Sequence, residues 1–345
     1  MKNNKRNKIT LALSLSMTAL LAACGGGGGS SSTATTGTSS ASSSTSSSTG
    51  SSGGTTQGNV GSLSTPTYAA GSPALAAFDQ LNQMRQTCTF PQLAENSLLD
   101  KSVANHWNYV NLNGGPNFVN HYETSGNPGF TGVTPENRAA YVGYPYNGLG
   151  EVITDASTNV GGAASITSLG STPYHATLLF GDLAEIGIVY QQLGSAAGSY
   201  YEFIADMGAQ TVSPTAPTIS GAPLTWPCQG ATNVERENLS GESPTPYVNG
   251  APANNVAGSW GTPIVIEGGA SDTITLSSVS VTGPSGNVPV SFYDSANDPN
   301  NDLAASMAFA IPNAPLAATT TYSVVASGTI NGTPFSRSFS FTTGN

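Results

Sequence analysis

A run of small polar residues between positions 25 and 65 sets the strongest limit on how this chain can fold. Nearly every residue in it is glycine, serine or threonine. Such a segment cannot bury enough apolar surface to offset the entropy lost on ordering, so we expect it to be disordered. As a flexible tether it would have an r.m.s. span of roughly 35 Å. The folded part is then restricted to the residues that follow, which suffice for two ordinary domains.

The residues before this tether predict export. An apolar run at 9–23 is too short to cross a bilayer, which needs about 20 residues. The run follows a basic segment, so residues 1–23 have the pattern of a secretory signal peptide. The basic residues of that segment are Lys2, Lys5, Arg6 and Lys8.

The apolar run ends in LAAC, which resembles the lipobox of bacterial lipoproteins. The resemblance implies cleavage before Cys24, lipidation of its sulfur and a membrane anchor, with residues 24–66 as the tether. Glycine at position 25 is not an inner-membrane retention residue, so we expect the outer membrane, on either its periplasmic or its cell-surface face. The alternative is an ordinary signal peptide followed by an accidental cysteine.

The charge balance argues against a nucleic-acid partner. The chain has nine basic and 19 acidic residues, and four of the basic residues lie in the signal segment, which has no acid. The mature chain would therefore carry a net charge near −14. Its remaining basic residues are scattered, whereas phosphate contacts need clustered lysines and arginines. We expect a monomer that does not bind nucleic acid.

Two cysteines remain once Cys24 is set aside, namely Cys88 and Cys228. In an oxidising compartment two cysteines most simply form one disulfide. It would close a loop of about 140 residues, for which chain entropy suggests a stabilisation on the order of 4–5 kcal/mol. Two free buried thiols are the alternative.

Helix and strand signals are mixed before about residue 211. Caps, N-terminal prolines and apolar spacing predict four helices. They cover residues 73–88, 97–112, 135–143 and 173–181. The segments AEIGIVYQ and YYEFIADMG are predicted as two neighbouring strands. This mixture predicts an α+β domain over residues 67–210, with helices flanking a small antiparallel sheet.

Only strand and turn signals follow a Pro-rich connector at 211–250. In residues 251–345 the predicted strands are PIVIE, ITLSSVSVT, VPVSFYD, MAFAIP, TTYSVVASGTI and PFSRSFSFTT. Asn331-Gly332, between the last two, is a strong two-residue hairpin signal. Strands at this spacing predict an all-β, immunoglobulin-like sandwich. The end of the chain also resembles the bacterial Ig-like domains of exported proteins.

Several motifs between residues 74 and 209 resemble the CAP superfamily in its bacterial, SCP-like extracellular form. They are LNQMRQTCTFPQLAENSLLDKSVANHWNYV, NHYETSGNPGFTGVTPENRAAYVGY, GEVI, STPYHATLL and EIGIVY, in that order. The resemblance implies a CAP-type α-β-α sandwich with a central cavity. It also implies that two histidines and two acids line the cavity, where some family members bind a divalent metal.

Carried over residue by residue, the two histidines are His121 and His175, and one acid is Glu151. The family's second acid precedes the second histidine, where this chain has SITSLGSTPY and no acid. Glu123 is the candidate replacement, since residues i and i+2 of a strand share a face. His106 lies on the apolar face of a predicted helix, which is typical of a hydrogen-bonded core histidine.

Imidazoles and carboxylates of this kind can bind a zinc-like ion or act as acid and base. His121 and His175 are therefore candidate metal ligands, and a structural hydrogen-bonded cluster is the alternative. No metalloprotease, serine-hydrolase, P-loop or dinucleotide motif appears in the folded part.

We expect a non-enzymatic, surface-tethered lipoprotein that binds a lipid-like molecule or an envelope partner in the cavity. A metal-dependent hydrolase using His121, Glu151 and His175 is one alternative, and a purely structural or adhesion protein is another.

Overall fold

The computed structural model describes residues 63–194, 200–211 and 219–345. The predicted signal peptide, the lipidation site at Cys24 and most of the tether lie outside these residues. No described helix is long and apolar enough to cross a membrane. The predicted α+β fold class is confirmed, and the domain boundaries proposed above stay predictions.

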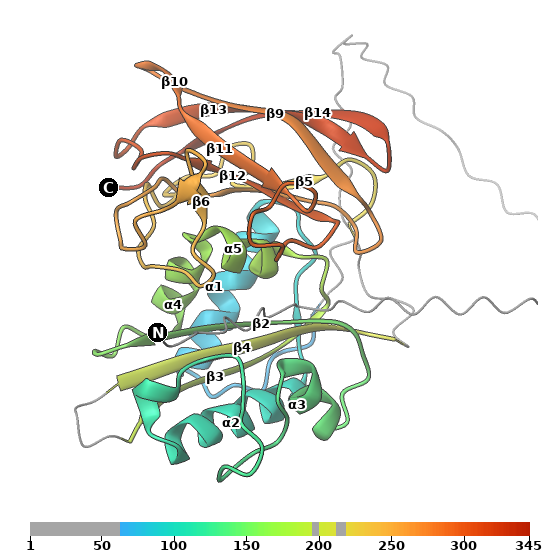
Figure 1. The fold of residues 1–345 in the computed structure, drawn as a ribbon, viewed down its shortest axis with the longest axis vertical. Coiled ribbons are helices and arrows are strands. Elements are labelled where there is room, and N and C mark those ends of the chain that lie inside the picture. The colour runs from blue at the N-terminus through green and yellow to red at the C-terminus, as the bar shows by residue number, and fades with distance from the viewer. Residues whose placement is uncertain (1–62, 195–199, 212–218) are drawn as a thin grey trace, which may run out of the picture. The chain divides into compact units, whose positions relative to one another are not determined.

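One mixed sheet organises the first part of the described chain (Figure 1). Its strand order is β1-β3-β4-β2. β4 pairs antiparallel with both of its neighbours, and β1 pairs parallel with β3. The strands are β1 (Ala94–Glu95), β2 (Tyr146–Ala156), β3 (Glu185–Leu193) and β4 (Tyr200–Gln210). The two strands predicted from sequence are therefore central neighbours, and β2 forms one edge.

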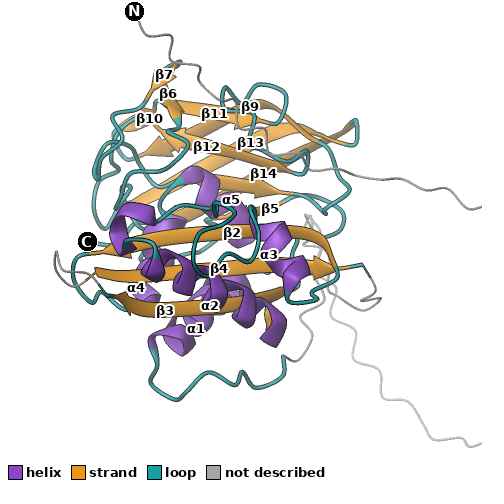
Figure 2. Cartoon of the chain, turned by 60° about the horizontal axis from the view of Figure 1, so that its bottom comes forward, coloured by secondary structure: helices purple, strands orange, loops and turns teal. Residues whose placement is uncertain are grey.

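Helices cover both faces of this sheet (Figures 1 and 2). One face carries α2 (Ser97–Leu112) and α3 (Pro135–Tyr141), with the 3-10 helix η1 (Gly115–Phe118) between them in sequence. The other face carries α1 (Pro73–Thr87), α4 (Gly162–Gly170) and α5 (Pro173–Phe180). The result is a layered α-β-α arrangement.

Local capping explains why the predicted helix starts were correct. The Ser72 hydroxyl accepts a hydrogen bond from Leu75 N, and proline occupies the first position of α1. The Asn96 side chain accepts from Leu98 N at the start of α2. These caps satisfy amides that a helix leaves without partners, so a few adjacent residues fix each start.

The sequence did not predict α4 or the strand β2. α4 begins and ends with glycine and has no side-chain cap. β2 contains Gly148 and Gly150, and glycine normally weakens a strand. The structure shows why Gly150 is needed, because a Cβ there would lie 2.8 Å from Leu178 of α5. Tertiary packing therefore decides an element that local propensity disfavours.

Two four-stranded antiparallel sheets form the C-terminal part, in the orders β10-β9-β13-β14 and β11-β12-β8-β5. All six predicted strands are present. The first sheet contains β9 (Ile274–Gly283), β10 (Gly286–Val288), β13 (Thr321–Ile330) and β14 (Thr333–Thr342). The second contains β5 (Leu224–Trp226), β8 (Ile264–Glu267), β11 (Val290–Asp294) and β12 (Met307–Pro312). A small ribbon pairs β6 (Tyr247–Val248) with β7 (Ala251–Pro252).

The hairpin predicted at Asn331-Gly332 joins β13 to β14, with Ile330 opposite Thr333. Both turn residues have positive φ, 51° and 77°, as a type I′ turn requires. Along β13 buried and exposed residues alternate, and the buried ones share a core with residues of β8 and β12. The two sheets therefore pack face to face as a sandwich.

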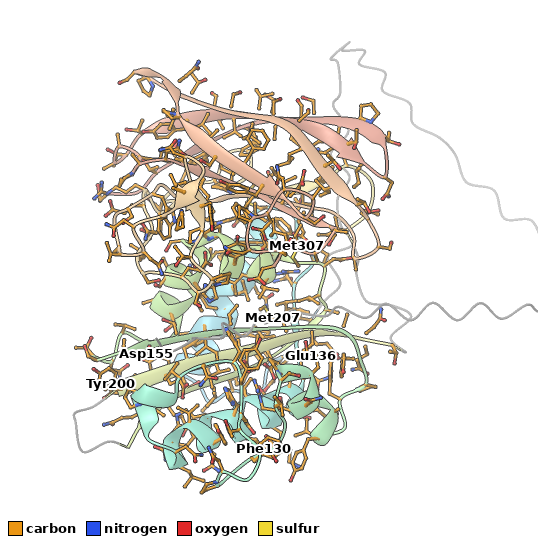
Figure 3. The ribbon with its side chains drawn as sticks, viewed as in Figure 1. Phe130, Glu136, Asp155, Tyr200, Met207 and Met307 are labelled. Atoms are coloured by element: carbon orange, nitrogen blue, oxygen red, sulfur yellow. A yellow bond between two sulfur atoms is a disulfide. The ribbon has the colours of Figure 1, made fainter. Side chains whose placement is uncertain are left out.

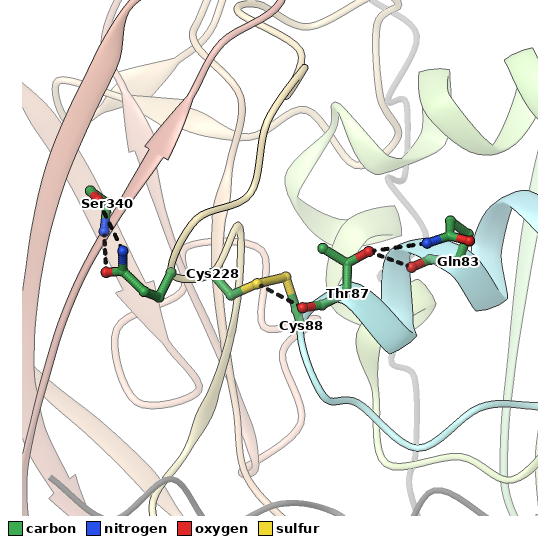
Figure 4. The surroundings of a disulfide bond; sticks show 6 residues. Gln83, Thr87, Cys88, Cys228 and Ser340 are labelled. Atoms are coloured by element: carbon green, nitrogen blue, oxygen red, sulfur yellow. Dashed lines mark hydrogen bonds between the residues drawn. A yellow bond between two sulfur atoms is a disulfide. The ribbon is translucent and has the colours of Figure 1, made fainter. Parts of the chain in front are cut away.

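The two parts of the described chain share a hydrophobic core. Phe180 at the end of α5 stacks on Trp226 of β5, with ring centroids 4.7 Å apart. Met207 of β4 belongs to the same core (Figure 3). The predicted disulfide between Cys88 and Cys228 is confirmed, and it joins the C-terminus of α1 to the segment after β5 (Figure 4).

Candidate functional site

His121 lies in the loop between η1 and α3, where residues 119–132 form no strand. Its side chain is 34% exposed, and Nδ1 lies 2.9 Å from Glu151 Oε1. Glu151 is buried on β2 and faces α3. Two of the residues that the resemblance proposed for one cavity, His121 and Glu151, are therefore in direct contact, and their role in a cavity stays a prediction. The strand face that was expected to hold Glu123 beside His121 is absent, because this segment is a loop.

Arg138 of α3 fixes the other side of this pair. Its Nη2 donates to Glu151 Oε2, and its Nη1 donates to the carbonyl of His121 at 3.0 Å. Burial raises the pKa of Glu151, but the Arg138 charge and the His121 hydrogen bond outweigh burial and hold it well below its usual range. Glu151 is therefore an acceptor, so His121 carries its hydrogen on Nδ1.

Glu123 binds His106 instead. Glu123 Oε1 lies 3.0 Å from His106 Nδ1, and Oε2 accepts from the amides of Thr131 and Gly132. Burial raises the pKa of Glu123, yet the hydrogen bonds from His106 and these amides leave it lowered. The other imidazole nitrogen, Nε2, lies 2.8 Å from the carbonyl of Asn120.

Both His106 nitrogens therefore face atoms that can only accept. The ring is thus held between the Glu123 carboxylate and the Asn120 carbonyl, and both the His106 and the Glu123 side chains are fully buried. The interpretation of His106 as a hydrogen-bonded core histidine is confirmed. This pair is fully buried and braces α2 against the loop before α3.

His175 forms a second histidine–acid pair on α5. Its side chain is 12% exposed, and Nδ1 lies 2.9 Å from Glu242 Oε1 and 3.0 Å from Thr172 Oγ1. Glu242 Oε1 also accepts from the His175 amide at 2.8 Å. A bare Nδ1 would point its lone pair at an oxygen that is already an acceptor, so Nδ1 carries the hydrogen here as well.

The two partly exposed imidazoles thus share one arrangement, in which Nδ1 faces a buried glutamate. Among residues 63–194, 200–211 and 219–345, none forms a hydrogen bond with Nε2 of His121 or of His175. A neutral imidazole held in this way offers an Nε2 lone pair to a ligand or a proton.

The loop after β11 lies within electrostatic range of both pairs. Burial, the charge of Asp298 and the charge of Glu242 raise the pKa of Asp302, while His121 lowers it. Asp298 itself accepts from the Tyr174 hydroxyl, which ties this loop to α5 beside His175. The surroundings of both histidines are therefore acidic.

The structure supplies the acid for His175 that the sequence left unfound. Glu242 lies in the predicted connector, 67 positions after His175. No local pattern marks it, because only the tertiary fold brings it to α5. Arg138 was visible in the motif NHYETSGNPGFTGVTPENRAAYVGY, but its role needs the fold as well.

A zinc ion needs at least three protein donors. Within the described ranges, no group of three or more histidine, cysteine, aspartate or glutamate side chains is arranged to hold a metal ion. The Nδ1 atoms of both candidate ligands, His121 and His175, already face glutamates. These donors therefore do not fit a zinc site.

Comparisons with known proteins leave the function open. No protein-family model matches the chain, and a search of curated proteins gave no match. Among solved structures, the chain is similar to an outer surface protein from Borrelia burgdorferi, with 15% identity and a TM-score of 0.33. That match covers 40% of this chain and 93% of the other. So low a score does not establish a common fold.

Proposed function

We propose that this chain is an exported, lipid-anchored envelope protein whose α+β part binds a lipid-like ligand through His121 and His175. The export and anchor rest on the N-terminal sequence, which ends in the lipobox-like LAAC. The ligand site rests on one observation: two buried glutamates each hold the Nδ1 side of a partly exposed histidine. The motifs similar to the CAP superfamily support the same pair of histidines.

Burying an acid is costly unless other groups compensate it. Removing a carboxylate from water costs several kcal/mol. For Glu151 the charge of Arg138 offsets this cost. For Glu242 no arginine or lysine forms an ion pair with it in the described part of the chain, where the imidazole of His175 is its partner. A buried carboxylate without an arginine or lysine partner contributes little to stability, and it is expected at a ligand-binding or catalytic site.

The surroundings restrict the chemistry of the ligand. Asp302 lies in the field of both pairs, and the charges of Glu136 and Asp302 also reach Tyr122, next to His121. An anionic headgroup would be repelled. The free Nε2 atoms accept hydrogen bonds when neutral. The favoured ligand therefore carries an ammonium or hydroxyl headgroup.

A purely architectural protein is the second candidate. The pair of His106 and Glu123, together with Arg138, is wholly buried and would stabilise the fold without any ligand. That network accounts for Arg138 and Glu151. It does not account for two partly exposed imidazoles whose Nε2 atoms make no hydrogen bond within the described residues.

Modification by diethyl pyrocarbonate tests the proposal, because the reagent attacks unprotonated imidazole nitrogen. The protein is treated with and without micelles of short-chain phosphatidylethanolamine, and each histidine is followed by mass spectrometry. We expect the lipid to slow the modification of His121 and His175 together. Micelles of phosphatidylglycerol, which are anionic, should protect much less. His106 should not react in any sample, since it is fully buried.

The architectural alternative predicts a different result. Equal reaction of His121 and His175 with and without both lipids would contradict the proposed function.

A further inference from the structure

The segment that carries Glu242 is held against the start of α5 by polar contacts. Ser171 Oγ accepts from the amide of Leu239 at 2.9 Å, and Ser168 Oγ lies 3.3 Å from Ser240 Oγ. This segment belongs to the connector predicted from sequence, not to the α+β part. A stretch far along the chain therefore covers the junction between α4 and α5.

Asn255 fixes the backbone of Glu242 from both sides. Its Oδ1 accepts from the Glu242 amide at 2.7 Å, and its Nδ2 donates to the Glu242 carbonyl at 2.8 Å. Gly241 allows the close approach, because a Cβ there would lie 2.6 Å from the Asn255 carbonyl oxygen. These contacts hold the backbone of Glu242 in place without any contribution from His175.

Glu242 does two things at α5. Thr172, the residue before the helix, makes no side-chain cap. Glu242 Oε1 takes its place by accepting from the His175 amide, which is one of the free amides of the first turn. The same oxygen lies 2.9 Å from His175 Nδ1. Glu242 Oε1 thus contacts both the backbone amide of His175 and the Nδ1 atom of its ring.

The second oxygen of this side chain is buried and lacks a hydrogen-bond partner within the described residues. A buried acceptor left in this state is unfavourable for stability. A simple helix cap could be made by an exposed serine or aspartate at lower cost. The unfavourable burial of this oxygen has an explanation if the role of Glu242 is to orient the ring of His175.

We propose that Glu242 is a positioning residue, which holds His175 in the tautomer with hydrogen on Nδ1 and a free Nε2. The connector and the C-terminal part then complete a site that the α+β part cannot form alone. This inference rests on the proposed function only in taking His175 as a residue that contacts the ligand. It departs from the family pattern, in which the second acid precedes the histidine.

Long-range ¹H–¹⁵N NMR of the imidazoles in the intact mature protein tests this directly, since it shows which nitrogen carries hydrogen. At a pH where His175 is neutral, we expect hydrogen on Nδ1 in the wild type. Glu242→Ala should shift the ring toward the hydrogen-on-Nε2 form that predominates in a free histidine side chain. Glu242→Gln should retain the wild-type tautomer, because the amide oxygen still accepts.

Two controls separate orientation from general damage. His121, held by Glu151, should keep its tautomer in every variant. Glu237→Ala removes a partly exposed acid of the same connector, paired with Arg236, and should leave His175 unchanged.

An unchanged His175 tautomer in a folded Glu242→Ala protein would overturn the inference. So would hydrogen on Nε2 in the wild type, a result that does not depend on whether any variant folds. If lipid protects His121 and His175 from diethyl pyrocarbonate but His175 carries its hydrogen on Nε2, the role of Glu242 is wrong and the proposed function stands. The expected tautomer without lipid protection would remove the proposed function alone.

Discussion

Buried acids that no motif marks shape the layer between α2 and the sheet. Glu202 lies on β4 with no exposed surface, and neither of its carboxyl oxygens has a hydrogen-bond partner in the described chain. Burial, with smaller contributions from Glu151 and Asp155, raises the pKa of Glu202 to about 9. Asp206 lies opposite Glu151 across the strand pair, and burial together with Glu151 raises its pKa far above the usual range. Glu202 is therefore a neutral acid near pH 7.

This protonation predicts how stability depends on pH. Between about pH 4.5 and pH 9, the folded protein keeps the Glu202 proton while the unfolded chain releases it. Stability therefore falls as pH rises through this interval. Glu202→Gln removes the effect, so its stability relative to wild type should rise by on the order of a few kcal/mol from pH 5 to pH 9. Urea unfolding at several pH values measures it. For the control Glu237→Gln, we expect the difference in free energy of unfolding from wild type to be the same at every pH. The same constant difference for Glu202→Gln would contradict a protonated Glu202.

Arg138 is the cation on which Glu151 and the His121 loop depend. Arg138→Gln would leave Glu151 buried without its charge partner. We expect a loss of roughly 3–5 kcal/mol in the free energy of unfolding. The exposed pair of Arg236 and Glu237 provides the control, and Arg236→Gln should cost less than about 1 kcal/mol. Similar small losses for both variants would show that Arg138 does not carry this network.

The packing of α2 on β3 is set by one glycine. A Cβ at Gly187 would lie 2.2 Å from Asp100 N in the first turn of α2. Gly148 on β2 is different, because a Cβ there would meet only Leu183, at an ordinary 3.6 Å. The close approach places the face of α2 that carries His106 directly over the sheet.

Gly187→Ala should therefore push α2 away from β3 and destabilise the protein by about 1–3 kcal/mol. Gly148→Ala is the matched control and should cost less. Thermal unfolding of both variants measures the difference. Equal midpoints would show that α2 can move without cost.

Sequence patterns predicted the elements whose signals are local and failed where contacts are distant. Helix starts with a side-chain cap, such as Ser72 before α1, and the turn at Asn331 depend on a few adjacent residues. β2 was missed because its glycines are explained only by α5. The resemblance proposed His121, Glu151 and His175 as cavity residues, and this stays a prediction. The strand spacing that paired Glu123 with His121 was wrong, because residues 119–132 form no strand. Glu242 had no sequence signal, because its partner lies 67 positions away.

At the scale of the whole molecule, one covalent bond and one shared core join the two parts. The disulfide between Cys88 and Cys228 spans 140 positions. It lies near Phe180 and Trp226, whose stacking belongs to the same core. Glu242 follows Cys228 within the same connector, so its placement depends on both the disulfide and the shared core.

Removing the disulfide should therefore lower stability and loosen the site. For a loop of this length, Cys88→Ser together with Cys228→Ser should cost roughly 5 kcal/mol. Denaturant unfolding measures the loss, and addition of a reductant to the wild type should reproduce it. A double variant as stable as the oxidised protein would contradict this account.

The most direct test of the central claim is a single long-range ¹H–¹⁵N spectrum of the three imidazoles in the mature protein. The structure holds the His106 ring between the carboxylate of Glu123 and the carbonyl of Asn120. It predicts hydrogen on Nδ1 alone for His121 and His175, once the pH is high enough for each to be neutral. Hydrogen on Nε2 of either partly exposed ring would contradict the claim that buried glutamates set the tautomers of these histidines.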